Sequence, residues 1–410
     1  MDEAQREKSP WKRNLYILWV CTFIAGIAFS ELMPFMSLYV SQLGHFSKAQ
    51  VSFYSGLVYA ATFLVTAIVS PLWGMLADIK GRKIMLIRAS FGMAFAMFLM
   101  GLVTNVWELI ALRALQGLFS GFISNAQALI ASQTPRKHSG KALGTLVTGS
   151  TSGMLMGPII GGALAQFFSI RDTFFITASL LALAGILSAT LVKEYFVPIK
   201  REKNSEEHRG LLSQFQNPRL IIVLLISTMM VQLGNISIAP IISLYIKELM
   251  HNQGPIALVA GIIAALPGIS NIISAPRLGA YGDAHGSNKV LMAGYLFAVI
   301  MYFPQGFVSS IWLLGILRFF IGISDGALFP TIQTLLTKNS PTSATSATSA
   351  VFSWNQSFQA LGNMFGSLLG GSLAGLFDYN VVFISTATLL LLNFLILWFT
   401  EPNLRLKFNR

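Results

Sequence analysis

The stretch GTLVTGSTSGMLMGPIIGG, residues 144–162, has glycine at every fourth position from Gly149 through Gly153 and Gly157 to Gly161. It carries no charge, although glycine and proline are the residues least suited to a helix. Residues four apart share one helix face, so a helix here would present a strip without side chains. Such a strip lets a neighbouring helix approach closely, as small residues do in membrane proteins. The stretch therefore predicts a tightly packed membrane helix.

The composition of the whole chain is that of an integral membrane protein. Of its 410 residues, 54% are hydrophobic and 11% are charged, and the mean hydropathy is +0.65, whereas about 25% of a soluble domain is charged. The net charge of +12 is spread between apolar segments rather than gathered on one polar module, so we expect no nucleic-acid partner. The single cysteine, Cys21, excludes an internal disulfide, and no Cys/His spacing suggests a metal site.

Twelve apolar stretches are each long enough to cross a bilayer, which takes about 20 residues. They cover residues 14–36, 51–75, 84–104, 107–133, 140–164, 172–192, 219–247, 255–277, 289–308, 310–337, 347–373 and 379–400. The long polar segment 193–218 separates six of them from the other six. We therefore predict an all-α membrane protein with a six-helix bundle at 1–192, a linker at 193–218 and a second six-helix bundle at 219–410.

The positions of Lys and Arg predict how the chain is oriented. The two termini, the linker and the loops that follow even-numbered stretches contain 23 of the 28 basic residues, and the opposite loops contain three. Cytoplasmic loops carry an excess of Lys and Arg. Both termini and the linker are therefore predicted to be cytoplasmic, in a protein that crosses the cell membrane many times.

The second half of the chain repeats the first. MPFMSLYVSQL (33–43) aligns with APIISLYIKEL (239–249) at an offset of 206, and LRALQG (112–117) aligns with LRFFIG (317–322) at an offset of 205. Three further matches keep the same order along the two halves. Parallel repeats of six spans are the architecture of major facilitator transporters, in which substrate binds between the halves near the midplane.

The loop motif GMLADIKGRK (74–83) falls between the second and third stretches. Glycine permits a sharp turn there, and Asp78 can bond to backbone or pair with Arg82. The motif resembles the loop signature of the major facilitator superfamily. The resemblance implies that Asp78 latches the halves in one state, partly against the N-terminus of the eleventh span. The second copy of the motif has Ser287 and Asn288 in place of the basic residues, so the first latch should be the stronger. The candidate latch residues are Gly74, Asp78, Gly81 and Arg82 of the first copy and Asp283 of the second.

The glycine stretch resembles the antiporter motif of drug/proton exporters in that superfamily. Its matching residues are Gly144, Gly153, Gly157, Pro158, Gly161 and Gly162, and Gly149 completes the stripe. Close packing is their minimal role, and Pro158 favours a kink. The further hypothesis is that this helix and its repeat, with Gly362, Gly366 and Gly370, form the contact across which the halves move. The resemblance favours export over import.

Two arginines, Arg113 and Arg318, lie at least six residues inside predicted spans. A charge at the bilayer centre costs at least about 2.5–3.5 kcal/mol, so Arg113 must face the protein interior and find partners, with Gln116 one turn on. Arg318 is its duplicate. The segment around Arg113 resembles the family motif in which this arginine is tied to proton transfer. A purely structural ion pair is the alternative.

Two acids, Glu31 and Asp325, also lie within predicted spans. Buried carboxyl groups are the physical means of carrying a proton. Asp325 follows Arg318 by seven residues on the same helical face, so it is an ion-pair partner of that arginine, a titrating site, or both. Glu31 precedes Pro34 by one turn and is expected to face a central cavity, where a carboxylate also suits cationic substrates.

Amide side chains within the spans are candidates for lining a substrate pathway. Hydrogen bonding between helices is their more frequent use, but a pathway lined with leucine alone passes nothing polar. The candidates are Asn125, Gln232, Asn235, Asn355 and Gln356.

Over its entire length the chain resembles the twelve-span drug/proton antiporter family, in stretches such as WGMLADIKGRKIMLIR, ILRFFIGISDGALFPTIQTLL and FSWNQSFQALGN. The resemblance implies alternating-access export of amphipathic drugs or antibiotics, driven by protons, by a monomer in the bilayer that needs no cofactor. Relatives often carry an apolar residue where Glu31 stands, so the resemblance does not support a role for it.

A dedicated exporter of one endogenous metabolite, such as a siderophore or a sugar-like compound, would share every motif. A receptor or scaffold is disfavoured by the charges within the spans and by the lack of a sizeable soluble domain. No nucleophile–base pair, phosphate loop or metal cluster indicates an enzyme.

Overall fold

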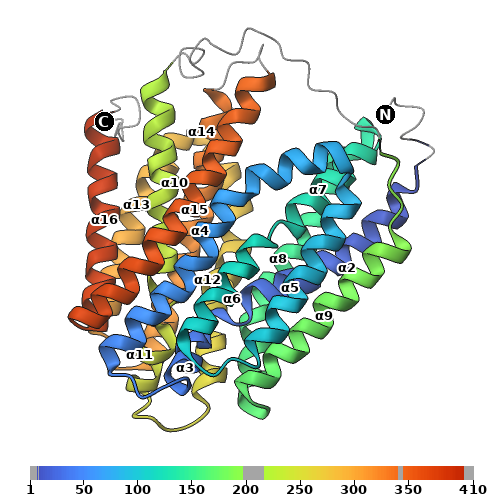
Figure 1. The fold of residues 1–410 in the computed structure, drawn as a ribbon. Coiled ribbons are helices and arrows are strands. Elements are labelled where there is room, and N and C mark those ends of the chain that lie inside the picture. Colours follow the sequence, from blue (N-terminus) through green and yellow to red (C-terminus); the bar gives the residue numbers. More distant parts are fainter. Residues whose placement is uncertain (1–6, 8, 197–216, 340–344, 401–410) are drawn as a thin grey trace. The chain divides into compact units, whose positions relative to one another are not determined.

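A computed structural model describes residues 7, 9–196, 217–339 and 345–400, in which all regular structure is helical (Figure 1). Within these ranges the description leaves out the side chains of Asp78, Arg136, residues 345–350, Phe352 and Ser353.

The first half of the chain forms these elements: α2 (Trp11–Ser30), η1 (Met33–Phe35), α3 (Met36–Gln42), α4 (Lys48–Lys80), α5 (Arg82–Met100), α6 (Val106–Leu118), α7 (Phe122–Gln133), α8 (Arg136–Phe167) and α9 (Ile170–Leu191). The second half forms these: α10 (Pro218–Ile238), α11 (Ile242–Leu249), α12 (Ile256–His285), α13 (Ser287–Tyr302), η3 (Phe303–Phe307), α14 (Ile311–Lys338), α15 (Thr345–Leu376) and α16 (Tyr379–Thr400).

The predicted crossing segments all appear as helices. Among the described residues, ten helical segments are long and apolar enough to span a membrane. The two remaining predicted spans are α8 and α15, which are helices of 32 residues each. Their many Gly, Ser and Thr residues lower the hydropathy but not the length, so the twelve-helix architecture is confirmed.

The internal repeat is visible in equivalent backbone breaks and hydrogen bonds. The first crossing segment is interrupted at Pro34 and the seventh at Pro240, because proline lacks the N–H that a continuous helix needs. Beyond each break, a tyrosine hydroxyl donates to a backbone carbonyl. Tyr39 bonds to Met100 at 2.8 Å, and Tyr245 bonds to Gln305 at 3.0 Å. The duplication read from the sequence is therefore a structural one.

Two compact units can be distinguished, and each contains a short segment from the other half of the sequence. One unit contains residues 1–45, 61–201 and 254–265, and the other contains residues 46–60, 202–253 and 266–410. The first turns of α4 thus belong with the C-terminal unit, and the first turns of α12 belong with the N-terminal unit. The division at 1–192 and 219–410 stays a prediction of the sequence repeat.

The glycine strip on α8 packs against α2, its most extensive helix partner (Figure 1). A Cβ atom at Gly149 would lie 2.7 Å from the carbonyl oxygen of Trp19, and one at Gly161 would lie 2.5 Å from that of Glu31. Gly153 and Gly157 meet the α2 backbone between these points. Side chains at these four positions would separate the two helices.

The glycines from Gly149 to Gly161 pack against α2, which belongs to the same unit. The hypothesis that α8 and α15 form the contact across which the halves move stays a prediction. The repeat behaves alike: Gly362, Gly366 and Gly370 of α15 lie against Met229, Leu233 and Ser237 of α10. A periodicity of four identifies the face of a helix that is bare, but it does not identify the helix that covers it.

Two other glycine contacts hold the starts of α4 (48–60) and α12 (256–265), which we call the exchanged segments. In the N-terminal unit, a Cβ atom at Gly162 would lie 3.3 Å from the Cα of Gly261 on α12, and Gly261 also meets the carbonyl of Pro158. In the C-terminal unit, a Cβ atom at Gly371 on α15 would lie 2.8 Å from the Cα of Gly56 on α4. The two pairs are related by the sequence repeat, since Gly261 follows Gly56 by 205 residues and Gly371 follows Gly162 by 209.

Gly153→Ala is expected to destabilise the protein by about 1–3 kcal/mol, because its Cβ would overlap the backbone of Phe23 and Ile27. Gly144→Ala is the matched control on the same helix, since no neighbouring atom lies within 4 Å of that Cβ position. Alanine should stabilise that exposed site slightly. The midpoint temperatures of thermal unfolding of the purified variants check this prediction. Equal midpoints for Gly153→Ala and Gly144→Ala would contradict the packing assignment.

Candidate functional site

Glu31 lies where the first crossing segment breaks, and its side chain is completely buried. The hydroxyl of Thr177 on α9 donates to one of its carboxyl oxygens, Oε1. The other oxygen, Oε2, is buried without a partner, and Gly161 of α8 packs against the Glu31 backbone. In this structure α8 and α9 contact Glu31, and the expectation that it faces a central cavity stays a prediction. The unpartnered oxygen retains the lone pairs to accept a further hydrogen bond or a proton.

Arg113 is buried in α6 and points at its neighbour one turn on. Its guanidinium donates from Nη1 to Oε1 of Gln116 at 2.7 Å, and its backbone carbonyl accepts a hydrogen bond from Thr62 at 3.0 Å. The predicted inward orientation and the proximity of Gln116 are confirmed. No direct ion pair between Arg113 and Glu31 is recorded in the described part of the chain.

The C-terminal unit contains a connected network of buried polar side chains. Asn235 donates to Asp325 at 3.0 Å and accepts from the hydroxyl of Tyr302 at 2.8 Å. Tyr302 is in turn hydrogen-bonded to Arg318. The network therefore links α10, α13 and α14, and it connects a buried cation to a buried acid.

Arg318 and Asp325 do not form the direct ion pair that their spacing suggested; none is recorded for these described residues. Seven residues correspond to about 10.5 Å along a helix, so the two side chains could meet only if both were extended towards each other. Tyr302 and Asn235 bridge the gap instead. Two Arg318 nitrogens, Nε and Nη1, are buried without a partner. These N–H donors can therefore still bind an acceptor or an anionic group.

The predicted pathway amides fall in different environments. Asn355 is buried and accepts from Thr228 at 2.8 Å, which joins α15 to α10. Asn125 donates to the carbonyl of Gly121 at 2.7 Å. Gln232 is half-buried beside Gly362, and Gln356 is exposed. Only Asn235 belongs to the charged network, so sequence position alone did not separate network residues from helix-packing residues.

A cavity of about 290 Å³ adjoins Asn355 within the C-terminal unit. It is lined by Thr228, Phe329, Pro330, Ile332, Gln333, Asn355 and Gln359 of α10, α14 and α15. Its mixture of apolar surface, amide groups and a hydroxyl group suits a ligand with both apolar and polar parts. Asn355 is thus one of the predicted amides, and it lines a cavity.

The loop between α4 and α5 has the turn that its sequence predicts. Gly81 has a φ of +96° and Gly286, its duplicate, has a φ of +104°, a region that favours glycine. The side chain of Asp78 is outside the description, and Gly74 meets no atom within 4 Å at its Cβ position. Asp283 is exposed, with Lys338 at 3.8 Å. The latch function of these residues stays a prediction.

Glu194 is an element of this loop that sequence reasoning missed. Its carboxylate accepts the backbone N–H groups of Arg82 and Lys83, both at 2.8 Å, and so caps the N-terminus of α5. The preceding residue, Lys193, is held by hydrogen bonds between its backbone and buried Asn14. Glu194 follows the last span of the first half, and this position at the start of the predicted linker was the only available signal. It joins the start of the linker to the loop motif.

Arg88 was also missed, because it was counted with the loop residues. It lies inside α5, with its guanidinium 3.7 Å from the ring centre of Trp73 and a hydrogen bond to the carbonyl of Ser120 at 2.8 Å.

Within the described residues, no group of three or more His, Cys, Asp or Glu side chains is arranged to hold a metal ion.

Twelve crossing helices, a duplicated six-span plan and buried charged groups in both units define a multi-pass membrane transporter rather than an enzyme. The chain belongs to the Major Facilitator Superfamily, whose sequence model matches residues 18–258 and 224–410. The family resemblance inferred from the motifs is therefore confirmed. Transporters of this family carry small molecules across a membrane and generally need no cofactor.

Curated relatives match almost the whole chain. It is 46% identical over 388 residues to the multidrug resistance protein MdtG of Escherichia fergusonii, covering 95% of this chain and 94% of the relative. The MdtG protein of Salmonella heidelberg is also 46% identical, with 95% of each chain covered.

Solved structures show the same fold at low sequence identity. The nucleoside transporter NupG gives a TM-score of 0.74 at 14% identity, covering 94% of this chain and 98% of its own. A bacterial homolog of the human lysosomal transporter Spinster, in an inward-facing unoccupied conformation, gives 0.74 at 15% identity, with 98% and 100% covered.

Glu194→Ala is expected to lower the stability of the protein by about 1 kcal/mol, because two N–H groups at the start of α5 lose their charged cap. Glu194→Gln keeps an acceptor oxygen but not the charge, so its loss should be intermediate. Thermal unfolding in detergent measures both. An alanine variant as stable as the parent protein would show that the cap contributes nothing.

Proposed function

We propose that the protein exports amphipathic drugs or antibiotics in exchange for protons, by alternating access. The observation that carries this proposal is the 46% identity, over 95% of the chain, to the multidrug resistance protein MdtG. The resemblance of the α8 glycine stretch to the antiporter motif supports the direction of transport. The low identity of the solved transporters limits their support to the fold.

The proton carriers in this proposal are Asp325 and Glu31. Asp325 is buried and hydrogen-bonded through one oxygen to Asn235, in a network that ends at Arg318. Protonation of Asp325 would weaken its attraction to the buried arginine and change the hydrogen bonds of Asn235 and Tyr302. The chemistry of the network therefore allows the protonation state of one acid to change the packing of α10, α13 and α14.

Glu31 is the second candidate because of its position. It contacts α8 at the end of the glycine strip and α9 through Thr177. A proton on its unpartnered oxygen would change the interaction of α2 with both neighbours. Arg113 and Gln116, hydrogen-bonded to each other in α6, are proposed to assist in the N-terminal unit as Arg318 does in the C-terminal unit.

Alternating access requires contacts that can open, and the exchanged segments supply candidates. Gly56 and Gly371 bring α4 against α15, and Lys48 at the start of α4 is ion-paired with Glu248 at 3.0 Å and Asp378 at 2.9 Å. The lysine lowers the pKa of the Asp378 carboxyl group through its hydrogen bond. These groups are about half exposed, so each pair contributes little alone and can break during a transport cycle.

We also propose that the protein is a monomer in the inner (plasma) membrane, with both termini and the linker in the cytoplasm. The distribution of basic residues supports this orientation. In this arrangement, Glu194 and the α4–α5 loop lie on the cytoplasmic side.

Asp325→Asn is expected to abolish proton movement evoked by drug in proteoliposomes, because an amide cannot take up and release the coupling proton. Glu31→Gln tests the second candidate in the same way. Glu7→Gln, at an exposed carboxyl that precedes α2, is the matched control and should transport normally. A pH-sensitive dye inside vesicles with an imposed proton gradient provides the measurement.

Undiminished proton movement in Asp325→Asn with normal expression would reject its role, and the same outcome in Glu31→Gln would reject that residue. Absence of drug-evoked proton movement in the parent protein would reject proton coupling. A deletion strain with unchanged drug sensitivity that accumulates one cell product would instead favour a dedicated metabolite exporter.

A further inference from the structure

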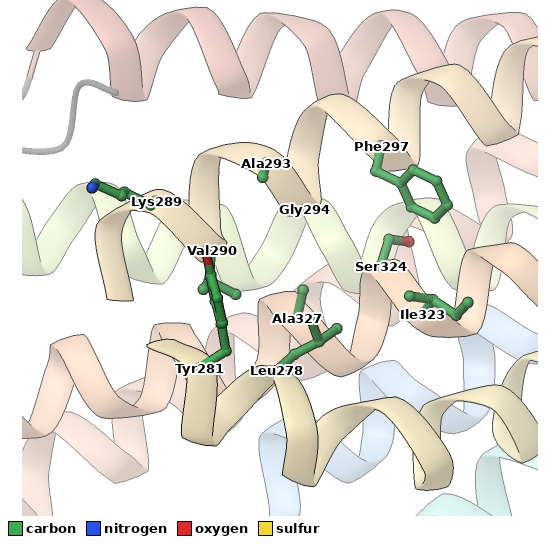
Figure 2. A pocket seen from close by; sticks show the side chains of 10 residues that line it. All are labelled: Leu278, Tyr281, Lys289, Val290, Ala293, Gly294, Phe297, Ile323, Ser324 and Ala327. Atoms are coloured by element: carbon green, nitrogen blue, oxygen red, sulfur yellow. The ribbon is translucent and has the colours of Figure 1, made fainter. Parts of the chain in front are cut away.

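A second cavity lies in the C-terminal unit, and neither the residues of the charged network nor Asn355 are among its lining residues. It has a volume of about 420 Å³ and is formed by α12, α13 and α14 (Figure 2). Its lining is mainly apolar, with Leu278, Val290 and Phe297 among its walls, and it contains no acidic side chain. The function proposed above makes no use of it.

The cavity is elongated along α13. Its α13 lining residues run from Lys289 to Phe297, a distance of about 12 Å along a helix. Figure 2 shows Lys289 at one end, Phe297 at the other and Ala293 between them. Because Ala293 is exposed and small, this side of α13 is open to whatever surrounds the helices. For a membrane protein, that surrounding is lipid.

The charged end of the cavity favours an anion. Lys289 is exposed, and no ion pair is recorded for it among the described residues. It lies in the first turn of α13, which begins after Gly286 without a side-chain cap, and the positive end of a helix dipole attracts negative charge. The nearby acid Asp283 is 3.8 Å from a different lysine, Lys338.

We propose that this cavity, an apolar groove along α13, binds one anionic phospholipid of the bilayer. An acyl chain lies along Val290 to Phe297, and the phosphate contacts Lys289 and the start of α13. Basic positions between membrane helices bind anionic head groups in this way. A cationic amphipathic compound does not fit, because the groove offers it a lysine and no carboxylate.

Lipid binding to the purified full-length protein tests this proposal without any transport assay. In a neutral detergent, dioctanoyl phosphatidylglycerol is titrated against dioctanoyl phosphatidylcholine, and bound lipid is counted by native mass spectrometry. The parent protein should prefer the anionic lipid. Lys289→Gln should weaken its binding about fivefold, and Ala293→Trp should abolish it by filling the groove.

Leu296→Trp is the matched control, because Leu296 is exposed on the same helix but does not line the groove. It should bind the lipid as the parent protein does. Equal binding of the two lipids, or unchanged binding in Lys289→Gln, would overturn the proposal. So would competition by inorganic phosphate alone at the lipid's own concentration, which would indicate a simple anion site. Should Ala293→Trp fail to fold, the exposed Lys289→Gln variant still decides the outcome.

Discussion

The structure depends on the close approach of helix backbones at glycine. Inside a bilayer, helices satisfy their own backbone hydrogen bonds and gain little from apolar burial against one another, since lipid is equally apolar. Their association then relies on contact area, which is greatest where side chains are absent. The strip from Gly149 to Gly161 brings α8 onto α2, and its repeat on α15 brings that helix onto α10. These two seams organise the units around them.

The seams also position the polar chemistry. Glu31 lies at the end of the α2–α8 seam, where the bare Gly161 leaves room for its backbone and Thr177 approaches from α9. In the other unit, α15 packs against α10, and Asn235 of α10 is hydrogen-bonded to Asp325 and Tyr302. Buried carboxyl groups are costly in such surroundings, so they are retained only where neighbouring helices are held closely enough to provide hydrogen bonds.

The exchanged segments give glycine a second use. Gly56 with Gly371, and Gly162 with Gly261, join the starts of α4 and α12 to helices from the other half of the sequence. The two contacts are equivalent in the repeat, yet only the α4 contact is accompanied, among the described residues, by ion pairs, those of Lys48 with Glu248 and Asp378. Duplication therefore preserved the packing of the backbone, while the charges that accompany it diverged.

The amino-acid sequence by itself determined the membrane class, the twelve crossing segments, the duplication, the turn at Gly81 and the inward position of Arg113. These follow from hydropathy, periodicity and local backbone preference, which act within a few residues of one another. Only the tertiary structure decided which helix covers the glycine strip, that Tyr302 and Asn235 connect Arg318 to Asp325, and that Glu194 caps α5. Such contacts join residues far apart in the chain, and periodicity reveals the face of a helix but not its neighbour.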